Sequence, residues 1–218
     1  MPATLNLSPD ELLTTTRAVR RRLDFDRPVE LDVVRECLRV ALQAPSGSNR
    51  QGWHWVVVTD SDQRARIAEL YLSAFAEYRD SATQPGGLFA AEAERAAVQK
   101  RVSTSVEYLA QNMHRVPVML IACVRAPGSA LLTDAAQATM WGSLFPAVWS
   151  YMLAARARGL GTAWTDLHLR YEQEVAEILG LPDGIRQGPL IPTAYTLGTD
   201  FKAAPRGSLD DVLHIDRW

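Results

Sequence analysis

Residues 41–58 read ALQAPSGSNRQGWHWVVV, and a helix-like pattern gives way to a strand-like one within them. Apolar residues before this stretch recur at steps of three and four, and Pro45 restricts Ala44 so that the helix ends there. Trp53–Val58 is an apolar run of strand length. The polar loop between them, Pro45–Gln51, displays more hydroxyl and amide groups than a connection needs. The loop is either an ordinary connection or one wall of a site for a flat ligand with a polar edge.

Similar patterns divide the rest of the chain into helices separated by single strands. Ser8, Pro9 and Glu11 form a capping box for a first helix that is predicted to run to about Arg17. The other helices are predicted at about 29–44, 61–78, 89–114, 134–158 and 172–179, and the strands at 53–58, 117–124, 162–169 and 189–198. Helices with few strands between them predict one layered domain over 1–218, of α+β or α/β class, in which long helices cover the sheet.

Two further segments differ from their surroundings. The predicted helix 134–158 carries apolar or aromatic residues almost all round, which favours a place inside something larger than the edge of a monomer. The segment SATQPGG, residues 81–87, is the clearest break in the chain. We expect it to be a loop or lid that shapes access to a site. The tail, residues 199–218, is predicted to be extended, with at most one helical turn.

Length and composition fit a soluble globular protein and exclude several other classes. The 218 residues are enough for one domain with a substantial core. The net charge is −2, so nothing global favours nucleic acid or an anionic membrane as partner. The longest apolar run, 117–124, is too short to span a bilayer, and the amino terminus has no signal-peptide pattern. We therefore expect a cytoplasmic protein with no nucleic-acid and no membrane partner.

Several motifs that carry chemistry are absent from the sequence. It contains no GxGxxG or GxxxxGK[ST] phosphate loop, no GxSxG and no HExxH. The two cysteines, Cys37 and Cys123, lack metal-ligand or CxxC spacing and suit a reducing compartment. The four histidines are scattered, and each is expected to be a surface residue or a locally satisfied one. No metal site is predicted.

A pattern typical of cofactor binding remains, spread over three places. Arg17, Arg20 and Arg206 could neutralise a phosphate, because a planar guanidinium matches phosphate oxygens. The polar loop could bind ring-edge atoms, and the predicted strand from Thr162 to Leu167 could lie along a flat ring. No general acid or base is evident, which favours chemistry supplied by a cofactor. A plainer interpretation makes the basic cluster a counter-charge for the dipole at a helix carboxyl end.

Four short blocks occur in a fixed order along the chain. They are RAVR (17–20) followed by Phe25, Pro28 and Val29; APSGSNRQGWHWVVV (44–58); RGLGTAW (158–164); and LGLPDG (179–184) followed by an apolar strand and Arg206. In this order the blocks resemble the nitroreductase family of FMN-dependent oxidoreductases. The second block is the most specific of the four, and together they extend over nearly the whole chain.

The resemblance implies a three-layer α+β fold, in which helices flank a central mixed, mostly antiparallel sheet. It also implies a domain-interlocked homodimer with FMN at the interface and with the tail, about 199–218, reaching across the partner subunit. Hydride would pass from NADH or NADPH through flavin N5 to a nitroaromatic, a quinone or a similar small acceptor by a ping-pong mechanism. No side chain is catalytic in this scheme, because the flavin carries the chemistry.

The resemblance further implies a set of FMN-binding residues. They are Arg17, Ala18 and Arg20 in the first block, Ser46, Ser48 and Asn49 in the loop, Trp164 and Thr165 after the Gly-Leu-Gly turn, and Arg206 in the tail. Ala18 stands where serine is usual in the family, and Thr16 stands where the first arginine is usual. Arg21 or Arg22 could compensate by reaching inward.

Three alternatives keep the flavin and change its use. The protein could be a dehydrogenase or reductase of a dedicated metabolite, or its hydride donor could be a deazaflavin. It could also bind flavin without turnover. A nucleic-acid role for the basic cluster is disfavoured, because acidic residues balance the charge and no aromatic stacking platform accompanies the arginines.

Overall fold

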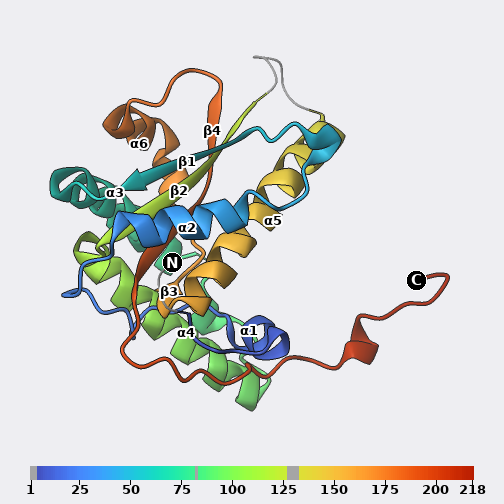
Figure 1. The fold of residues 1–218 in the computed structure, drawn as a ribbon. Coiled ribbons are helices and arrows are strands. Elements are labelled where there is room, and N and C mark those ends of the chain that lie inside the picture. Colours follow the sequence, from blue (N-terminus) through green and yellow to red (C-terminus); the bar gives the residue numbers. More distant parts are fainter. Residues whose placement is uncertain (1–3, 82, 127–132) are drawn as a thin grey trace.

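A four-stranded antiparallel sheet, in the order β1-β2-β4-β3, forms the middle layer of the protein (Figure 1). This computed structural model describes residues 4–81, 83–126 and 133–218. The strands are β1 (Trp53–Val58), β2 (Val118–Arg125), β3 (Leu160–Thr162) and β4 (Ile185–Tyr195). A parallel bridge joins Ala18 to Thr162 at the β3 edge. The prediction of a mixed, mostly antiparallel sheet is confirmed.

Helices cover both faces of the sheet, so the predicted three layers are confirmed. The helices are α1 (Pro9–Thr15), α2 (Leu31–Ala41), α3 (Ser61–Arg79), α4 (Ala93–Asn112), α5 (Asp134–Ala157) and α6 (Glu172–Leu179). One core cluster joins α2 and α5 to the sheet, and a second joins α3, α4 and α6 to the opposite face. Strand β2 serves both clusters, because successive side chains point to opposite faces. Leu120 enters the first cluster and its neighbour Ile121 the second, and both are fully buried.

Close packing of α5 on β4 depends on Gly188. A Cβ atom at this position would lie 2.7 Å from Leu144 Cδ2 and 3.1 Å from the backbone oxygen of Ala122. We expect Gly188→Ala to destabilise the protein by about 1–3 kcal/mol, because overpacking forces the helix or the neighbouring strand to shift. Denaturant unfolding measures this. Gly142→Ala on α5, whose Cβ would meet nothing within 4 Å, is the matched control, and we expect it to be neutral or stabilising. Equal stability of both variants would contradict the prediction.

The first helix is shorter than predicted, and this changes the place of the arginines. The capping box at Ser8 and Glu11 is present, but α1 ends at Thr15 instead of Arg17. The chain then runs extended beside β3, where Val19 N donates to Thr162 O at 2.8 Å. The plainer interpretation of the basic cluster is therefore wrong, since the cluster does not lie at a helix carboxyl end.

The strand predicted at 162–169 is also wrong. Strand β3 ends at Thr162, and Leu167–Tyr171 form a 3₁₀ helix that begins where Leu169 N donates to Asp166 O. The alternation of side chains suggested a strand, but the segment pairs with β4 again only at a bridge between Thr165 and Leu190. Residues 163–166 are thus an irregular edge of the sheet.

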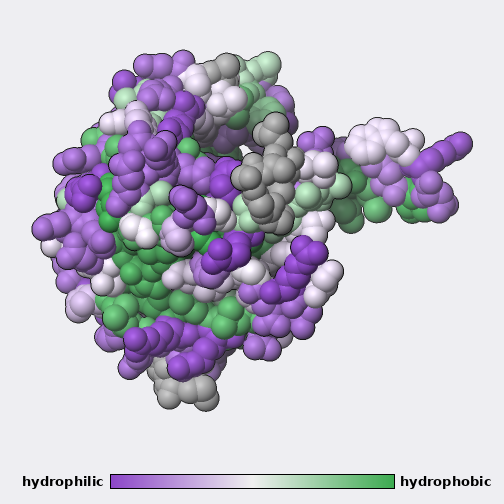
Figure 2. All heavy atoms as spheres, turned by 90° about the horizontal axis from the view of Figure 1, so that it is seen from above, coloured by the Kyte–Doolittle hydropathy of each residue, from purple (hydrophilic) through white to green (hydrophobic). Residues whose placement is uncertain are grey.

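Other boundaries differ by a few residues. The helix predicted at 89–114 is regular over Ala93–Asn112, and β4 begins earlier than predicted, at Ile185. Within the segment 81–87, Pro85–Gly87 form a 3₁₀ turn, while Ala82 lies outside the described residues. The tail is extended with one 3₁₀ turn, Leu209–Asp211, and projects away from the domain (Figures 1 and 2). In the described part of the chain, no helix is long and apolar enough to cross a membrane.

Candidate functional site

The extended segment 17–20 brings the first block next to the Gly-Leu-Gly turn. Ala18 is exposed and bridges to Thr162, two residues before Trp164. Arg17 is also exposed, and its Nη1 donates to the carbonyl of Lys202 at 3.1 Å. The first block, the turn and the start of the tail therefore meet at one edge of the sheet.

Arg20 is half-buried at this edge and lacks an acidic partner. Its Nη1 donates to Ser105 Oγ on α4 at 3.3 Å, and it makes no ion pair among the residues that the structure describes. Burial lowers the pKa of its guanidinium, and the nearby hydroxyls of Tyr71 and Tyr78 oppose that shift weakly. A half-buried cation without a carboxylate can receive an anionic or electron-rich ligand.

Thr165 is held from two sides, and one of its partners, Tyr71, also lies close enough to Arg20 to interact with it electrostatically. The backbone of Thr165 exchanges hydrogen bonds with Leu190 on β4, at 3.1 Å and 2.8 Å. Its Oγ1 lies 2.8 Å from the hydroxyl oxygen of Tyr71 on α3. Tyr71 is 1 % exposed, and burial raises its pKa to about 12. Sequence reasoning missed Tyr71, because a tyrosine on the buried face of a helix carries no signal beyond core packing.

Trp164 lies on the face of the sheet that α5 covers, opposite to Tyr71, and forms one wall of an aromatic hollow of about 250 Å³. The lining residues are Trp141, Phe145, Trp164, Asp166, Leu169, Gly188 and Pro189. The rings of Trp141 and Phe145 stack at 5.7 Å, and Trp164 meets Phe145 edge-on at 5.2 Å. Such a hollow has room for part of a flat ring. Asp166 at its rim is exposed and makes no ion pair within the described ranges.

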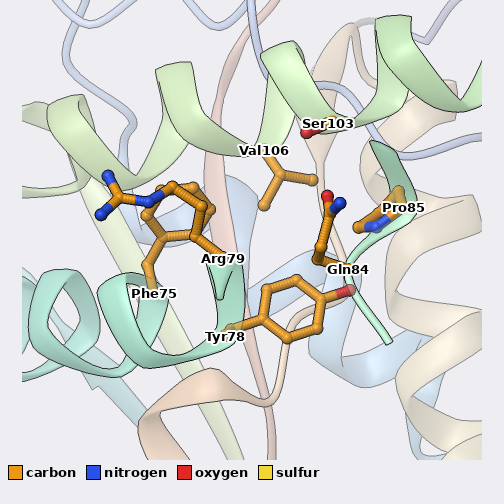
Figure 3. A pocket seen from close by; sticks show the side chains of 7 residues that line it. All are labelled: Phe75, Tyr78, Arg79, Gln84, Pro85, Ser103 and Val106. Atoms are coloured by element: carbon orange, nitrogen blue, oxygen red, sulfur yellow. The ribbon is translucent and has the colours of Figure 1, made fainter. Parts of the chain in front are cut away.

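A second hollow, between α3, α4 and the segment 83–87, is too small for a ligand. Its volume is about 10 Å³, which is room for one water molecule at most. Figure 3 shows the Gln84 side chain extending from the Tyr78 ring toward Ser103, and the hydroxyl of Tyr78 donates to Thr83 O at 3.2 Å. The segment is thus packed onto α3 and α4 here, and its role in access stays a prediction.

The polar loop packs on α5. Gly47 N donates to Ser143 Oγ at 2.9 Å, and the exposed Ser48 and Asn49 follow. Ser46 Oγ accepts from Gln51 N at 3.0 Å, and Asn49 Oδ1 accepts from Gln51 Nε2 at 2.9 Å. The backbone φ angles of Ser48, Asn49 and Gln51 are 53°, 51° and 51°. Three non-glycine residues in the left-handed region store strain, which is frequent at functional sites.

We call the sheet edge at residues 17–20 and 162–165 the arginine edge. Within one chain, the polar loop and the arginine edge do not meet. Gly47 contacts Ser143 on α5, whereas Trp164 contacts Phe145. Positions two apart on a helix point about 200° apart, so the loop and Trp164 lie on opposite sides of α5. The described residues of the loop share no hydrogen bond with residues 17–20.

The side chains of Arg206, Arg21 and Arg22 do not point toward Arg20 either, because each donates to backbone carbonyls elsewhere. Arg206 is exposed, and its Nη1 donates to the adjacent Pro205 carbonyl at 3.2 Å. Arg21 donates to Thr104 O at 3.4 Å on the surface of α4. Arg22 donates to three carbonyls at the start of the tail, those of Leu197, Gly198 and Asp200. The expectation that Arg21 or Arg22 compensates by reaching inward is therefore wrong.

His168 follows Thr165 in the 3₁₀ helix and departs from the expectation for the histidines. It is fully buried, and neither ring nitrogen has a hydrogen-bond partner among the described residues. Burial lowers its pKa to about 4, and the nearby Glu172 offsets this only in part. His168 is thus neither a surface residue nor a satisfied one.

Sequence comparison identifies the family. The model of the nitroreductase family matches residues 13–195, which is most of the chain and includes the arginine edge, the loop and Thr165. The chain belongs to the nitroreductase family. The expectation drawn from the four blocks is confirmed.

Relatives and solved structures agree with this assignment. A protein of Archaeoglobus fulgidus, provisionally named an NADH dehydrogenase/NAD(P)H nitroreductase, is 22 % identical over 212 residues, 95 % of this chain and 97 % of its own. The FMN and NADPH-dependent nitroreductase NfnB of Sphingopyxis sp. strain HMH superposes with a TM-score of 0.71 at 22 % identity, covering 97 % of this chain and 100 % of NfnB. Iodotyrosine deiodinase, solved with FMN and 3-iodo-L-tyrosine, gives 0.67 at 20 % identity, covering 92 % and 95 %.

Proposed function

We propose that this protein is an FMN-dependent oxidoreductase that takes hydride from NADH or NADPH and reduces a small acceptor such as a nitroaromatic or a quinone. The observation that carries the proposal is Arg20, a half-buried cation without an acidic partner among the described residues, which lies close to the Tyr71 hydroxyl that Thr165 contacts, in a nitroreductase-family chain. The names of NfnB and of the Archaeoglobus relative support the same cofactor and donors.

The residues at the edge fit the parts of FMN. Arg17 and Arg20 supply positive charge for the phosphate and for the electron-rich side of the ring. Arg206 is away from this edge within one chain and would join it only from the tail of a partner subunit. Ala18 contributes backbone only. Trp164 and Thr165 line the ring, with the aromatic hollow of about 250 Å³ beside them. The bound flavin supplies the hydride chemistry, and these residues bind and orient it.

We further propose that the site is completed by a second copy of the chain. Ser46, Ser48 and Asn49 lie on the far side of α5 from Trp164, so in a homodimer the loop of one subunit can approach the edge of the other. Phe145 and Trp149 on α5 are 39 % and 38 % exposed, which suits a helix that packs on a partner. The projecting tail, from 199, would then lie across that partner. Light scattering of the purified protein tests this, and a monomer that binds FMN fully would contradict it.

One open ring face used in turn by donor and acceptor gives ping-pong kinetics. The visible spectrum under anaerobic conditions tests the function. We expect flavin bands that bleach with NADH or NADPH and return with a quinone or a nitroaromatic. Bands that neither nicotinamide bleaches but a reduced deazaflavin does would favour that donor instead. Bands that no donor bleaches would favour a flavin-binding protein without turnover, and absence of bands after reconstitution with FMN would overturn the proposal.

A further inference from the structure

The contact between Tyr71 and Thr165 connects the core to the proposed flavin edge. The hydroxyl oxygen of Tyr71 and Oγ1 of Thr165 are 2.8 Å apart. Each oxygen has no other hydrogen-bond partner among the residues that the structure describes. Tyr71 is 1 % exposed, whereas Thr165 is half-buried at the sheet edge. This hydrogen bond therefore has one end in the core and one end at the site.

The direction of this hydrogen bond follows from burial. If Thr165 donated, the proton of the Tyr71 hydroxyl would be left in the core without an acceptor, which is unfavourable. If Tyr71 donates, both groups are satisfied, because the proton of Thr165 can turn to solvent or a ligand. Burial keeps Tyr71 protonated, since it raises the pKa to about 12 despite the nearby Arg20 cation. Tyr71 is therefore the donor and Thr165 Oγ1 the acceptor.

We propose that Tyr71 is a positioning residue that fixes the Thr165 hydroxyl as a hydrogen-bond donor toward acceptor atoms on the edge of the bound flavin. The inference rests on the proposed function. Tyr71 occupies one of the two lone pairs of Thr165 Oγ1 and restricts its rotation, which favours an orientation with the O–H toward a ligand. Backbone pairing of Thr165 with Leu190 holds the residue in place, so the orientation is kept.

A fixed donor distinguishes the two oxidation states of a flavin. N5 of an oxidised flavin accepts a hydrogen bond, while N5 of the two-electron-reduced flavin carries a proton and donates. A hydroxyl held with its O–H toward N5 favours the oxidised state. A hydroxyl that is free to rotate can also accept, and so it disfavours the reduced state less. Removing the Tyr71 hydroxyl should therefore raise the midpoint potential of the bound flavin.

The test compares Tyr71→Phe with Tyr151→Phe. Tyr151 is fully buried on α5, and its hydroxyl lies 3.1 Å from Thr193 Oγ1, so the control loses a similar tyrosine–threonine bond in the core away from the edge. We expect Tyr71→Phe to increase the ratio of reduced to oxidised flavin about tenfold at a fixed potential, a rise of about 30 mV for a two-electron couple. Tyr151→Phe should lower thermal stability to a similar degree and leave the potential unchanged.

A double-mutant cycle with Thr165→Val separates positioning from a general loss of structure. In the Thr165→Val background, Tyr71→Phe should add no further shift in potential, because the hydroxyl on which it acts is gone. Thr165→Ser, which keeps the hydroxyl, should stay close to the wild type. An unchanged potential in Tyr71→Phe, or equal shifts in Tyr71→Phe and Tyr151→Phe, would overturn the inference.

The outcome can be told apart from failure of the proposed function. If the wild-type protein does not bind FMN, or binds it without any reduction by a donor, the proposed function is wrong. If the wild type binds and reduces FMN but the potential does not respond to Tyr71, only the positioning role is wrong. FMN affinity, measured by titration of the apoprotein, should change little in Tyr71→Phe, since the oxidised flavin can still receive the same O–H.

Discussion

Replacing Arg20 with leucine should weaken FMN binding by about 10- to 100-fold, because a hydrogen bond from a charged group contributes about 1.5–3 kcal/mol. The same change should leave the apoprotein at least as stable as the wild type. Arg20 is half-buried, burial lowers its pKa, and no carboxylate pairs with it among the described residues. A partly buried charge without a partner costs free energy, and an apolar replacement removes that cost. Opposite effects on ligand affinity and on stability identify a residue kept for binding.

Titration of the apoprotein with FMN, followed by flavin fluorescence, gives the affinity, and thermal unfolding without FMN gives the stability. Arg21→Leu is the matched control, since Arg21 is adjacent, exposed and bonded to Thr104 O on α4. It should change neither quantity. Arg20→Lys keeps the charge but loses the planar fork, so an intermediate loss of affinity is expected. Wild-type affinity in Arg20→Leu would show that the arginine edge does not bind the flavin.

The elements that the sequence predicted well are those with strong local signals. The capping box at Ser8 predicts the start of a helix, and the apolar run of β2 predicts a buried strand. Both are present in the structure. The end of α1 and the arginine segment were harder to predict, because the segment after α1 pairs with β3, which lies far away in the sequence. Tertiary pairing of Val19 with Thr162 prevailed over helical propensity there.

The candidate site was predicted only in part, for physical reasons that differ between residues. Arg17 and Arg20 belong to a basic cluster that made them candidates for phosphate binding, and Thr165 was expected only from the family resemblance. Tyr71 acts through one buried hydroxyl, and nothing in a helical spacing distinguishes it from a core tyrosine such as Tyr151. In the homodimer that we propose, the place of the loop 46–49 relative to the edge would depend on a second subunit, which no pattern within one chain determines.

Lowering the pH from 7.5 to 5 should destabilise the protein by about 2 kcal/mol through His168 alone. Its pKa is about 4 in the folded protein, compared with the ordinary value of 6.5 in the unfolded chain. Below pH 6.5 the unfolded state therefore binds a proton that the folded state does not, and stability falls as the pH falls. The contribution is absent above about pH 6.5, grows down to pH 4 and is constant below it. Other groups titrate in this range too, so a comparison of variants is required.

Denaturant unfolding at pH 7.5 and pH 5 measures the effect, and His168→Leu should remove about 2 kcal/mol of the pH dependence whatever its stability at pH 7.5. The stability of each variant at pH 5 is compared with the stability of the same variant at pH 7.5. A cavity left by the substitution lowers both values alike and cancels in the difference. His54→Gln, at an exposed histidine of β1, is the control and should keep the wild-type dependence. Equal dependence in His168→Leu and the wild type would contradict the prediction. His168 lies in the 3₁₀ helix that follows Thr165, so its protonation should first loosen the turn next to the edge where we propose that the flavin binds. FMN binds the folded state, and saturating FMN should therefore oppose the acid destabilisation.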